Sequence, residues 1–136
     1  KFQEIDTYLI RDFLERRHKV IYTSYVSQTL NRMETVLLEN QDEFVEDRFG
    51  IPIPKNLKPI GLEKIQVVFI PLLQADTQGN RLGYGKGFYD RYLALCRPNV
   101  IKIGLNFFEP IPSIPAEKTD IPLNYLITPN RVYEFK

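Results

Sequence analysis

The spacing of hydrophobic residues predicts two amphipathic helices. In residues 7–17, apolar side chains gather on one helical face and charged side chains on the other, and Thr7 is of a type that caps helix N-termini. In residues 88–96, apolar side chains recur at i, i+3, i+4 and i+7, at Tyr89, Tyr92, Leu93 and Cys96. Each helix therefore has one face that needs a partner surface.

Runs rich in β-branched and aliphatic residues predict strands. The longest run, KIQVVFIPLL at residues 64–73, has the composition of a buried strand, and shorter runs lie at residues 19–24, 34–39, 100–107, 125–128 and 131–135. Strands that alternate with helices are typical of α/β proteins. We expect an α/β three-layer sandwich, in which a mostly parallel sheet carries helices on both faces.

Two segments between these elements lack a regular pattern. The acidic residues 41–47 are expected on a solvated surface. Residues 49–59 contain three prolines, which favour an extended loop over regular structure.

Composition narrows the class of protein. With 136 residues, 43% of them hydrophobic, we expect one domain over residues 1–136 with a sizeable core. A net charge of +1 gives no basic surface for nucleic acid. The apolar runs fall far short of the roughly 20 residues that span a bilayer, and the first residues lack the order of a signal peptide. We expect a cytoplasmic monomer without nucleic-acid or membrane partners, in which the lone cysteine packs in the core.

The most unusual stretch is QGNRLGYGKGFYDR at residues 78–91. Four of the chain's seven glycines fall within it, and three of them alternate with larger side chains. Glycine costs roughly 0.5–1 kcal/mol relative to alanine within regular structure, so this spacing suits a backbone that turns tightly or approaches another group closely. The stretch lies between a predicted strand and a predicted helix. In such an arrangement the backbone N–H groups of the loop and the dipole of the helix can converge on phosphate. Arg81 and Lys86 add positive charge to the same loop.

The common nucleotide motifs do not match this stretch. Lys86 is followed by Gly87 where the Walker pattern has serine or threonine, and the dinucleotide spacing G-x-G-x-x-G is absent. The spacing also disfavours an NAD-dependent oxidoreductase. On these residues alone, a plain connecting turn remains an alternative to phosphate binding.

A longer pattern resembles a known family. The run NRLGYGKGFYDR at residues 80–91 is similar to the signature of the 5-formyltetrahydrofolate cyclo-ligase family, also called methenyltetrahydrofolate synthetases. Three weaker segments resemble the same family in the same order: EIDT at residues 4–7, GIPIP at residues 50–54 and TDIPLNYLIT at residues 119–128. The resemblance therefore extends over nearly the whole chain.

The resemblance implies a reaction and its cofactors. Members of the family convert 5-formyltetrahydrofolate and ATP, with Mg²⁺, to 5,10-methenyltetrahydrofolate, ADP and phosphate. Such a phosphoryl transfer needs positioning and charge neutralisation more than a protein nucleophile. The chain carries no recognisable Ser/His/Asp or Cys/His arrangement, which is consistent with that chemistry.

The resemblance also implies site residues. Arg81 and Lys86 would offset phosphate charge during transfer, and Asp90 and Asp120 would bind the metal ion. The ATP-binding residues implied by the motif are Arg81, Leu82, Gly83, Tyr84, Gly85, Lys86, Gly87, Phe88 and Tyr89. The substrate-binding residues are Glu4, Tyr84 and Phe88.

Structural explanations compete with several of these assignments. Glu4 and Asp90 each lie where an acidic side chain complements a helix dipole, and Asp120 could cap backbone N–H groups in a loop. Tyr89 belongs to the helical stripe, which favours packing over stacking on a ligand.

The chain departs from the family pattern in four places. Ile53 replaces an acidic residue, Phe88 lacks a tyrosine hydroxyl, and Asn124 replaces another acid. Residues that match the family's N-terminal portion, a basic helix and a first strand, are also missing from this sequence. The competing hypothesis is therefore a non-catalytic nucleotide-binding module of the same fold.

Overall fold

The computed structural model describes residues 5–27, 29–39, 41–48, 50–83, 87–115 and 121–136. Its internal contacts group into two compact units, an N-terminal unit of residues 6–64 and a C-terminal unit of residues 65–136, with Ile5 grouped with the latter. The single domain expected over residues 1–136 stays a prediction.

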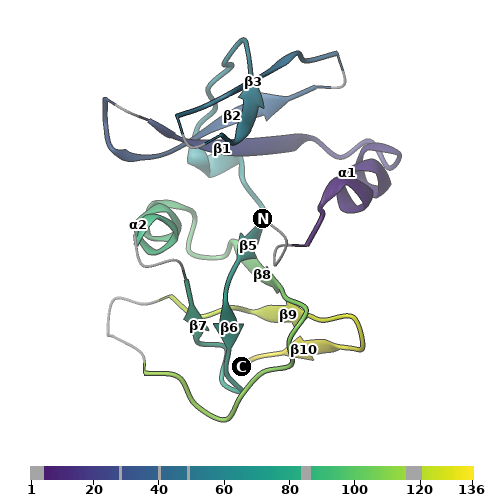
Figure 1. The fold of residues 1–136 in the computed structure, drawn as a ribbon, viewed down its shortest axis with the longest axis vertical. Helices are drawn as coiled ribbons and strands as arrows, with labels where there is room; N and C mark the ends of the chain where they lie inside the picture. The colour runs from purple at the N-terminus through teal and green to yellow at the C-terminus, as the bar shows by residue number, and fades with distance from the viewer. Residues whose placement is uncertain (1–4, 28, 40, 49, 84–86, 116–120) are drawn as a thin grey trace. The chain divides into compact units, whose positions relative to one another are not determined.

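The N-terminal unit combines one α-helix with two antiparallel strand pairs. Its elements are α1 (Tyr8–Glu15), β1 (Ile21–Ser27), β2 (Arg32–Leu38), β3 (Phe44–Glu46), β4 (Pro52–Pro54) and the short 3₁₀ helix η1 (Leu62–Lys64) (Figure 1). β1 pairs with β2 over their full lengths, from Ile21 opposite Leu38 to Ser27 opposite Arg32. The strands predicted at residues 19–24 and 34–39 are thus confirmed as the two arms of one hairpin.

Helix α1 confirms the first predicted helix with shorter bounds. Thr7 occupies the N-cap position, but its side chain makes no capping hydrogen bond; instead Asp6 Oδ1 accepts a hydrogen bond of 2.9 Å from the Tyr8 backbone N–H. His18 then ends the helical turn with a left-handed φ of 59°, a conformation common after the last helical residue.

The pair β3–β4 contradicts the expectation of a loop over residues 49–59. Pro52 and Pro54 lie in β4 opposite Glu46 and Phe44. A two-stranded sheet consists only of edge strands, and an edge strand tolerates proline where no ladder hydrogen bond is required of its nitrogen. The segment at residues 41–47 is exposed at most positions, as expected, although it also contains β3.

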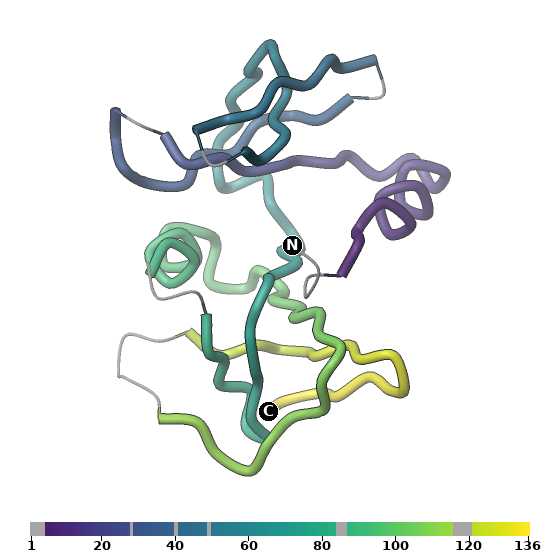
Figure 2. Tube along the Cα trace, in the orientation of Figure 1, coloured from purple at the N-terminus to yellow at the C-terminus, as the bar shows by residue number. Residues whose placement is uncertain are grey.

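The C-terminal unit is organised on a four-stranded sheet in the order β10-β9-β8-β5. Its elements are β5 (Val67–Pro71), β6 (Gln74–Ala75), β7 (Arg81–Leu82), α2 (Phe88–Leu95), β8 (Ile101–Leu105), β9 (Tyr125–Ile127) and β10 (Val132–Glu134). β5, β8 and β9 run parallel, β10 pairs antiparallel with β9, and β6 and β7 form a separate two-stranded hairpin. Figure 2 shows the chain leaving β5 through this hairpin and α2 before it returns in β8.

Helix α2 and the sheet both contribute buried side chains to this unit. Tyr92, Leu93 and Cys96 of the predicted stripe are buried, while Tyr89 is half-buried. Gly104 on β8 shows how tight the packing is, since a Cβ atom there would lie 2.7 Å from a methyl carbon of Leu123. Cys96 is a packing residue as expected, and burial raises the pKa of its thiol, which disfavours the reactive thiolate.

The predicted α/β class is confirmed, whereas the three-layer arrangement stays a prediction. The protein is mixed α/β, but parallel pairing between strands is confined to β5, β8 and β9, and the other described strand pairs are antiparallel. The described part of the C-terminal unit contains one α-helix, so helices on both faces of the sheet stay a prediction. Within the described ranges, no helix has the length and apolar character needed to cross a bilayer.

Candidate functional site

The glycine-containing segment begins as the hairpin β6–β7, directly after β5. Ala75 pairs with Arg81 and Gln74 with Leu82, and the Leu73 N–H donates to the Leu82 carbonyl over 2.8 Å. This hairpin, which contains Arg81, follows the carboxyl end of the parallel strand β5, and ligands bind beyond the carboxyl ends of strands in open α/β sheets.

A buried carboxylate closes the turn of this hairpin. Asp76 is 1% exposed, and its Oδ1 accepts hydrogen bonds of 2.9 Å from the N–H groups of Gln78 and Asn80. Its Oδ2 accepts from Asn80 Nδ2 over 3.0 Å and from the Ile114 N–H over 3.1 Å. Burial acts to raise the pKa of Asp76, but these hydrogen bonds outweigh burial and the net pKa is lowered. Asp76 therefore stays ionised in the folded protein.

Sequence reasoning did not single out Asp76. The composition DTQG at residues 76–79 is typical of a turn and indicates nothing more. One signal was available. Gln78 and Asn80 lie two and four residues after Asp76, and an aspartate side chain commonly accepts hydrogen bonds from backbone N–H groups shortly after it in a turn. What the sequence could not show was the fourth donor, Ile114, which lies 38 residues away.

The centre of the candidate site is an ion pair between Arg81 and Asp90. Arg81 Nη2 donates to Asp90 Oδ1 over 2.6 Å, and the Arg81 side chain is 6% exposed. Arg81 Nε is also buried and has no hydrogen-bond partner among the described residues. A buried guanidinium donor without a partner is costly unless a bound group takes it.

Asp90 joins this pair to the chain segment after residue 120. Its Oδ1 also accepts a hydrogen bond of 3.1 Å from the Ile121 N–H. Asp90 lies in the first turn of α2, as the sequence predicted, where its charge also complements the helix dipole. The structure therefore connects β7, the start of α2 and the chain at Ile121 through one carboxylate.

The glycines of the segment differ in what they require. Gly87 precedes α2 with a left-handed φ of 69°, and a Cβ there would lie 3.0 Å from Arg91 Nη1. Gly83 has no such backbone constraint, and among the described residues a Cβ there would meet only Arg81 Nη1, at 3.8 Å. The need for glycine is therefore clear at Gly87 and not at Gly83.

The aromatic residues at the start of α2 have protein partners in this structure. The Arg91 guanidinium lies 5.0 Å from the centre of the Phe88 ring, within the range of a cation–π contact. Phe88 and Tyr89 are both half-buried. Stacking of Phe88 on a ligand stays a prediction.

The structure brings together part of the expected set. Arg81, Leu82 and Gly83 lie at or just after β7, and Gly87, Phe88, Tyr89 and Asp90 lie at the start of α2. Outside the described residues lie Glu4, Tyr84, Gly85, Lys86 and Asp120. No group of three or more acidic, histidine or cysteine side chains able to hold a metal ion occurs in the described part of the chain.

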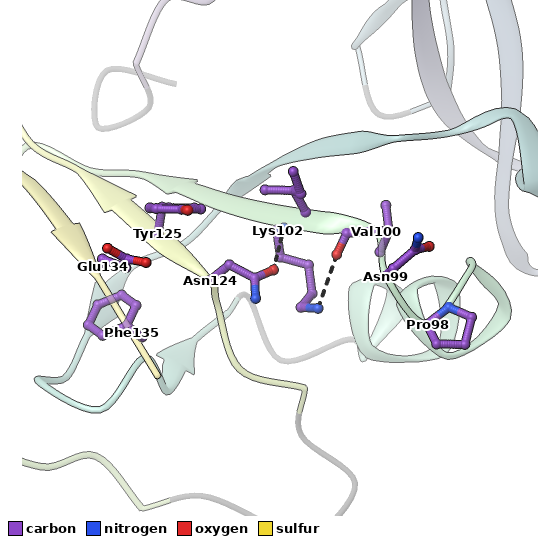
Figure 3. Close-up of a pocket in the computed structure, with 9 residues that line it drawn as sticks. Pro98, Asn99, Val100, Lys102, Asn124, Tyr125, Glu134 and Phe135 are labelled. Carbon is purple, nitrogen blue, oxygen red and sulfur yellow. Dashed lines mark hydrogen bonds between the residues drawn. The ribbon is translucent and has the colours of Figure 1, made fainter.

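A shallow polar pocket of about 220 Å³ lies elsewhere in the C-terminal unit, at the amino ends of β8 and β9 (Figure 3). Here the Lys102 N–H donates to Asn124 Oδ1 over 2.8 Å, and Lys102 Nζ donates to the Val100 carbonyl over 3.3 Å. Asn124, one of the departures from the family pattern, thus joins the two parallel strands. The pocket contains none of the predicted site residues.

Comparison with known proteins decides the family. The profile of the 5-formyltetrahydrofolate cyclo-ligase family matches residues 2–129. The chain belongs to this family. The cyclo-ligase of Escherichia coli is 30% identical over 137 residues, which cover 97% of this chain and 75% of that protein. The cyclo-ligase of Haemophilus influenzae is 38% identical over 84 residues, which cover 57% of this chain and 44% of that protein.

Two solved structures share the fold of this cyclo-ligase family member. The NMR structure of the 5,10-methenyltetrahydrofolate synthetase of Aquifex aeolicus matches with a TM-score of 0.81 at 25% identity, over 98% of this chain and 66% of that one. The synthetase of Mycoplasma pneumoniae matches with a TM-score of 0.67 at 22% identity, over 91% and 65% respectively. The chain spans about two thirds of the length of both solved relatives.

Proposed function

We propose that this protein converts 5-formyltetrahydrofolate to 5,10-methenyltetrahydrofolate with consumption of ATP. The observation that carries the proposal is the buried Arg81, paired with Asp90 at 2.6 Å, inside the segment that carries the family signature. Family membership over residues 2–129 supports the same reaction.

The proposed reaction balances as two steps. The formyl oxygen attacks the γ-phosphorus of ATP, the bond to the β-phosphate oxygen breaks, and ADP leaves. N10 of the folate then attacks the activated formyl carbon and loses its proton, a C–N bond forms, and the C–O bond breaks with release of phosphate. The protein's task in both steps is to hold the reactants and to stabilise charge on the transferred group.

Arg81 suits that task because, among the described residues, only Asp90 holds its guanidinium. Nη2 is oriented by Asp90, while the buried Nε lacks a partner in the described part of the protein. A phosphate oxygen would satisfy this donor with a charge-assisted hydrogen bond. Lys86, outside the described residues, is proposed to supply the second positive charge.

Asp90 is suited to serve as a magnesium ligand. Both of its hydrogen bonds with described residues end on Oδ1, so Oδ2 is the oxygen proposed to face the metal ion. Magnesium is held in proteins by one or two carboxylates together with substrate phosphates and water, so Asp90 with Asp120 would meet that need. When bound, Mg²⁺ would neutralise charge on the phosphate oxygens.

The other assignments complete the proposal. Leu82, Gly83, Tyr84, Gly85, Gly87 and Tyr89 would surround the ATP phosphates and base, and Glu4 with Phe88 would contact the folate. The substrate would be 5-formyltetrahydrofolate with or without a polyglutamate tail, and the protein would act as a cytoplasmic monomer.

An isotope experiment tests the reaction directly. We would supply 5-formyltetrahydrofolate whose formyl oxygen is a heavy isotope, with ATP and magnesium, and analyse the released phosphate by mass spectrometry. Direct phosphorylation of the formyl group predicts that the heavy oxygen leaves in phosphate, in a yield equal to the methenyltetrahydrofolate formed. A reaction without ATP is the control and should give no product.

Two other outcomes would contradict this proposal. Product formed with unlabelled phosphate would rule out phosphorylation of the formyl oxygen. ATP binding without any product would favour the non-catalytic nucleotide-binding module.

A further inference from the structure

The polar pocket at the amino ends of β8 and β9 lies at the opposite end of the parallel strands from Arg81. Because β5, β8 and β9 run parallel, their amino ends lie together, whereas Arg81 follows the carboxyl end of β5. The pocket has a volume of about 220 Å³. One water needs only about 10–15 Å³, and pockets for drug-sized ligands measure roughly 300–1,000 Å³. The pocket therefore suits a molecule that is larger than water and smaller than a nucleotide.

Hydrogen bonds fix the orientation of the Asn124 side chain in this pocket. Asn124 Oδ1 accepts from the Lys102 N–H over 2.8 Å, and the Asn124 N–H donates to the Lys102 carbonyl over 2.9 Å. Because Oδ1 is the acceptor, the NH₂ group of the amide points away from this bond, and no described residue accepts from it. The half-buried Asn124 thus presents two N–H donors to the cavity.

The half-buried Lys102 ammonium has spare donors beside this amide. Its hydrogen bond to the Val100 carbonyl, at 3.3 Å, is longer than the usual range of about 2.7–3.2 Å. An ammonium carries three N–H donors, and no described carboxylate forms an ion pair with this one. Figure 3 shows the Lys102 ammonium and the Asn124 amide nitrogen both below the ribbon of β8. A positive charge and an amide donor therefore lie in one cavity.

The lining of the pocket favours a ligand with a single negative charge. A carboxylate accepts on two oxygens, so it can take donors from Lys102 and Asn124 together. Glu134 also lines the pocket, and its negative charge repels a phosphate dianion more strongly than a monoanion. The rings of Pro98 and Phe135, on opposite sides of the pocket in Figure 3, offer contacts to a short apolar group.

We infer that this pocket binds a small monocarboxylate, a molecule with one carboxylate on a short apolar body. Lys102 Nζ and Asn124 Nδ2 donate to the two carboxylate oxygens, and Phe135 contacts the body. The site is separate from the candidate site at Arg81, and it does not depend on the proposed function.

Two substitutions remove the recognition groups one at a time. Lys102→Met removes the charge, and it keeps a side chain of similar length and the backbone N–H that donates to Asn124. Asn124→Asp keeps the shape and the acceptor for that N–H, but it replaces the amide donors with a negatively charged oxygen. Lys64→Met is the matched control, because Lys64 is an exposed lysine that does not line the pocket.

The test follows the backbone N–H signals of residues 102 and 124 by NMR while propionate is added at constant ionic strength. We expect saturable shifts with a Kd below about 10 mM, and binding at least about tenfold weaker in Lys102→Met and in Asn124→Asp. Lys64→Met should bind like wild type. Propanol, which lacks the carboxylate, and inorganic phosphate should each bind wild type at least about tenfold more weakly than propionate.

Thermal unfolding identifies which variants are folded. Wild type without saturable shifts would overturn the inference, and so would a folded Lys102→Met or Asn124→Asp protein that binds propionate like wild type. Phosphate that binds as tightly as propionate would show an adventitious ion only and contradict the proposed ligand class. The ranking of the three ligands on wild type needs no variant, so the test stays decisive if a substitution prevents folding.

Discussion

At the scale of single residues, the two buried charged side chains Arg81 and Asp76 differ in how fully their hydrogen-bonding groups are paired. Arg81 has a charged partner, Asp90, and retains a donor that no described residue accepts from. Asp76 has no charged partner in its hydrogen bonds, and four donors from Gln78, Asn80 and Ile114 satisfy it. Full satisfaction is typical of a residue that holds structure, whereas an unmet buried donor such as Arg81 Nε calls for a partner, which a bound ligand or water could supply.

The lowered pKa of Asp76 predicts a specific loss of stability in acid. An unfolded aspartate has a pKa of about 3.9, and the hydrogen bonds of Asp76 place its folded pKa below its ordinary value. The stabilisation is therefore complete above about pH 4 and is lost as the pH falls through the folded pKa. We expect the free energy of unfolding, measured with urea, to fall more steeply below about pH 4 in wild type than in Asp76→Asn.

The comparison isolates Asp76 because the groups bonded to it are uncharged. Gln78→Ala should reproduce the wild-type pH dependence. Parallel curves for wild type and Asp76→Asn would show that the Asp76 pKa is the same in the folded and unfolded chain.

At the scale of elements, the site depends on how α2 begins. The helix follows Gly87, whose left-handed backbone turns the chain immediately before Phe88 and places Asp90 in the first turn beside Arg81. The entry to the helix therefore sets the position of the ion pair.

Alanine substitutions at two glycines test this element. Gly87→Ala should cost about 1–2 kcal/mol in the free energy of unfolding, because a side chain disfavours positive φ. Gly83→Ala is the matched control and should have little effect, since the contact that its Cβ would make with the described residues, to Arg81 Nη1 at 3.8 Å, is an ordinary one. Chemical denaturation of both variants measures the difference, and equal stability would show that positive φ at Gly87 is not required.

The long periodic elements were predictable, and the short ones were not. The stripe of Tyr92, Leu93 and Cys96 predicted α2, and the aliphatic run around Val67–Pro71 predicted β5. Strands of two or three residues, such as β6 and β4, are too short to show alternation, and the prolines of β4 argued against a strand. Their formation depends on a partner strand, which local sequence does not reveal.

For the candidate site, too, individual residues were predictable from the sequence, but the contacts between them were not. The motif indicated Arg81 and Asp90 separately, one for phosphate and one for metal. That they bond to one another, and that Asp76 holds Ile114, are contacts between residues up to 38 positions apart. Residue type and spacing along the chain carry no information on such pairings.

At the scale of the whole molecule, two compact units are present, and the described part of the candidate site lies in the C-terminal one. The family match covers residues 2–129, and therefore extends over the N-terminal unit and most of the C-terminal unit. We therefore propose that the phosphate chemistry takes place in the C-terminal unit, at Arg81 and the start of α2.

The most direct test of this account is the ATP-dependent rise in methenyltetrahydrofolate absorbance, measured for wild type, Arg81→Ala and Arg131→Ala. Arg131 is the matched control, because it is an exposed arginine of the same unit whose side chain lies over Tyr133. We predict product with wild type and Arg131→Ala, and a rate at least about a hundredfold lower with Arg81→Ala, as expected when a group that stabilises transferred charge is removed. Product formed at the wild-type rate by a folded Arg81→Ala protein would contradict the central claim.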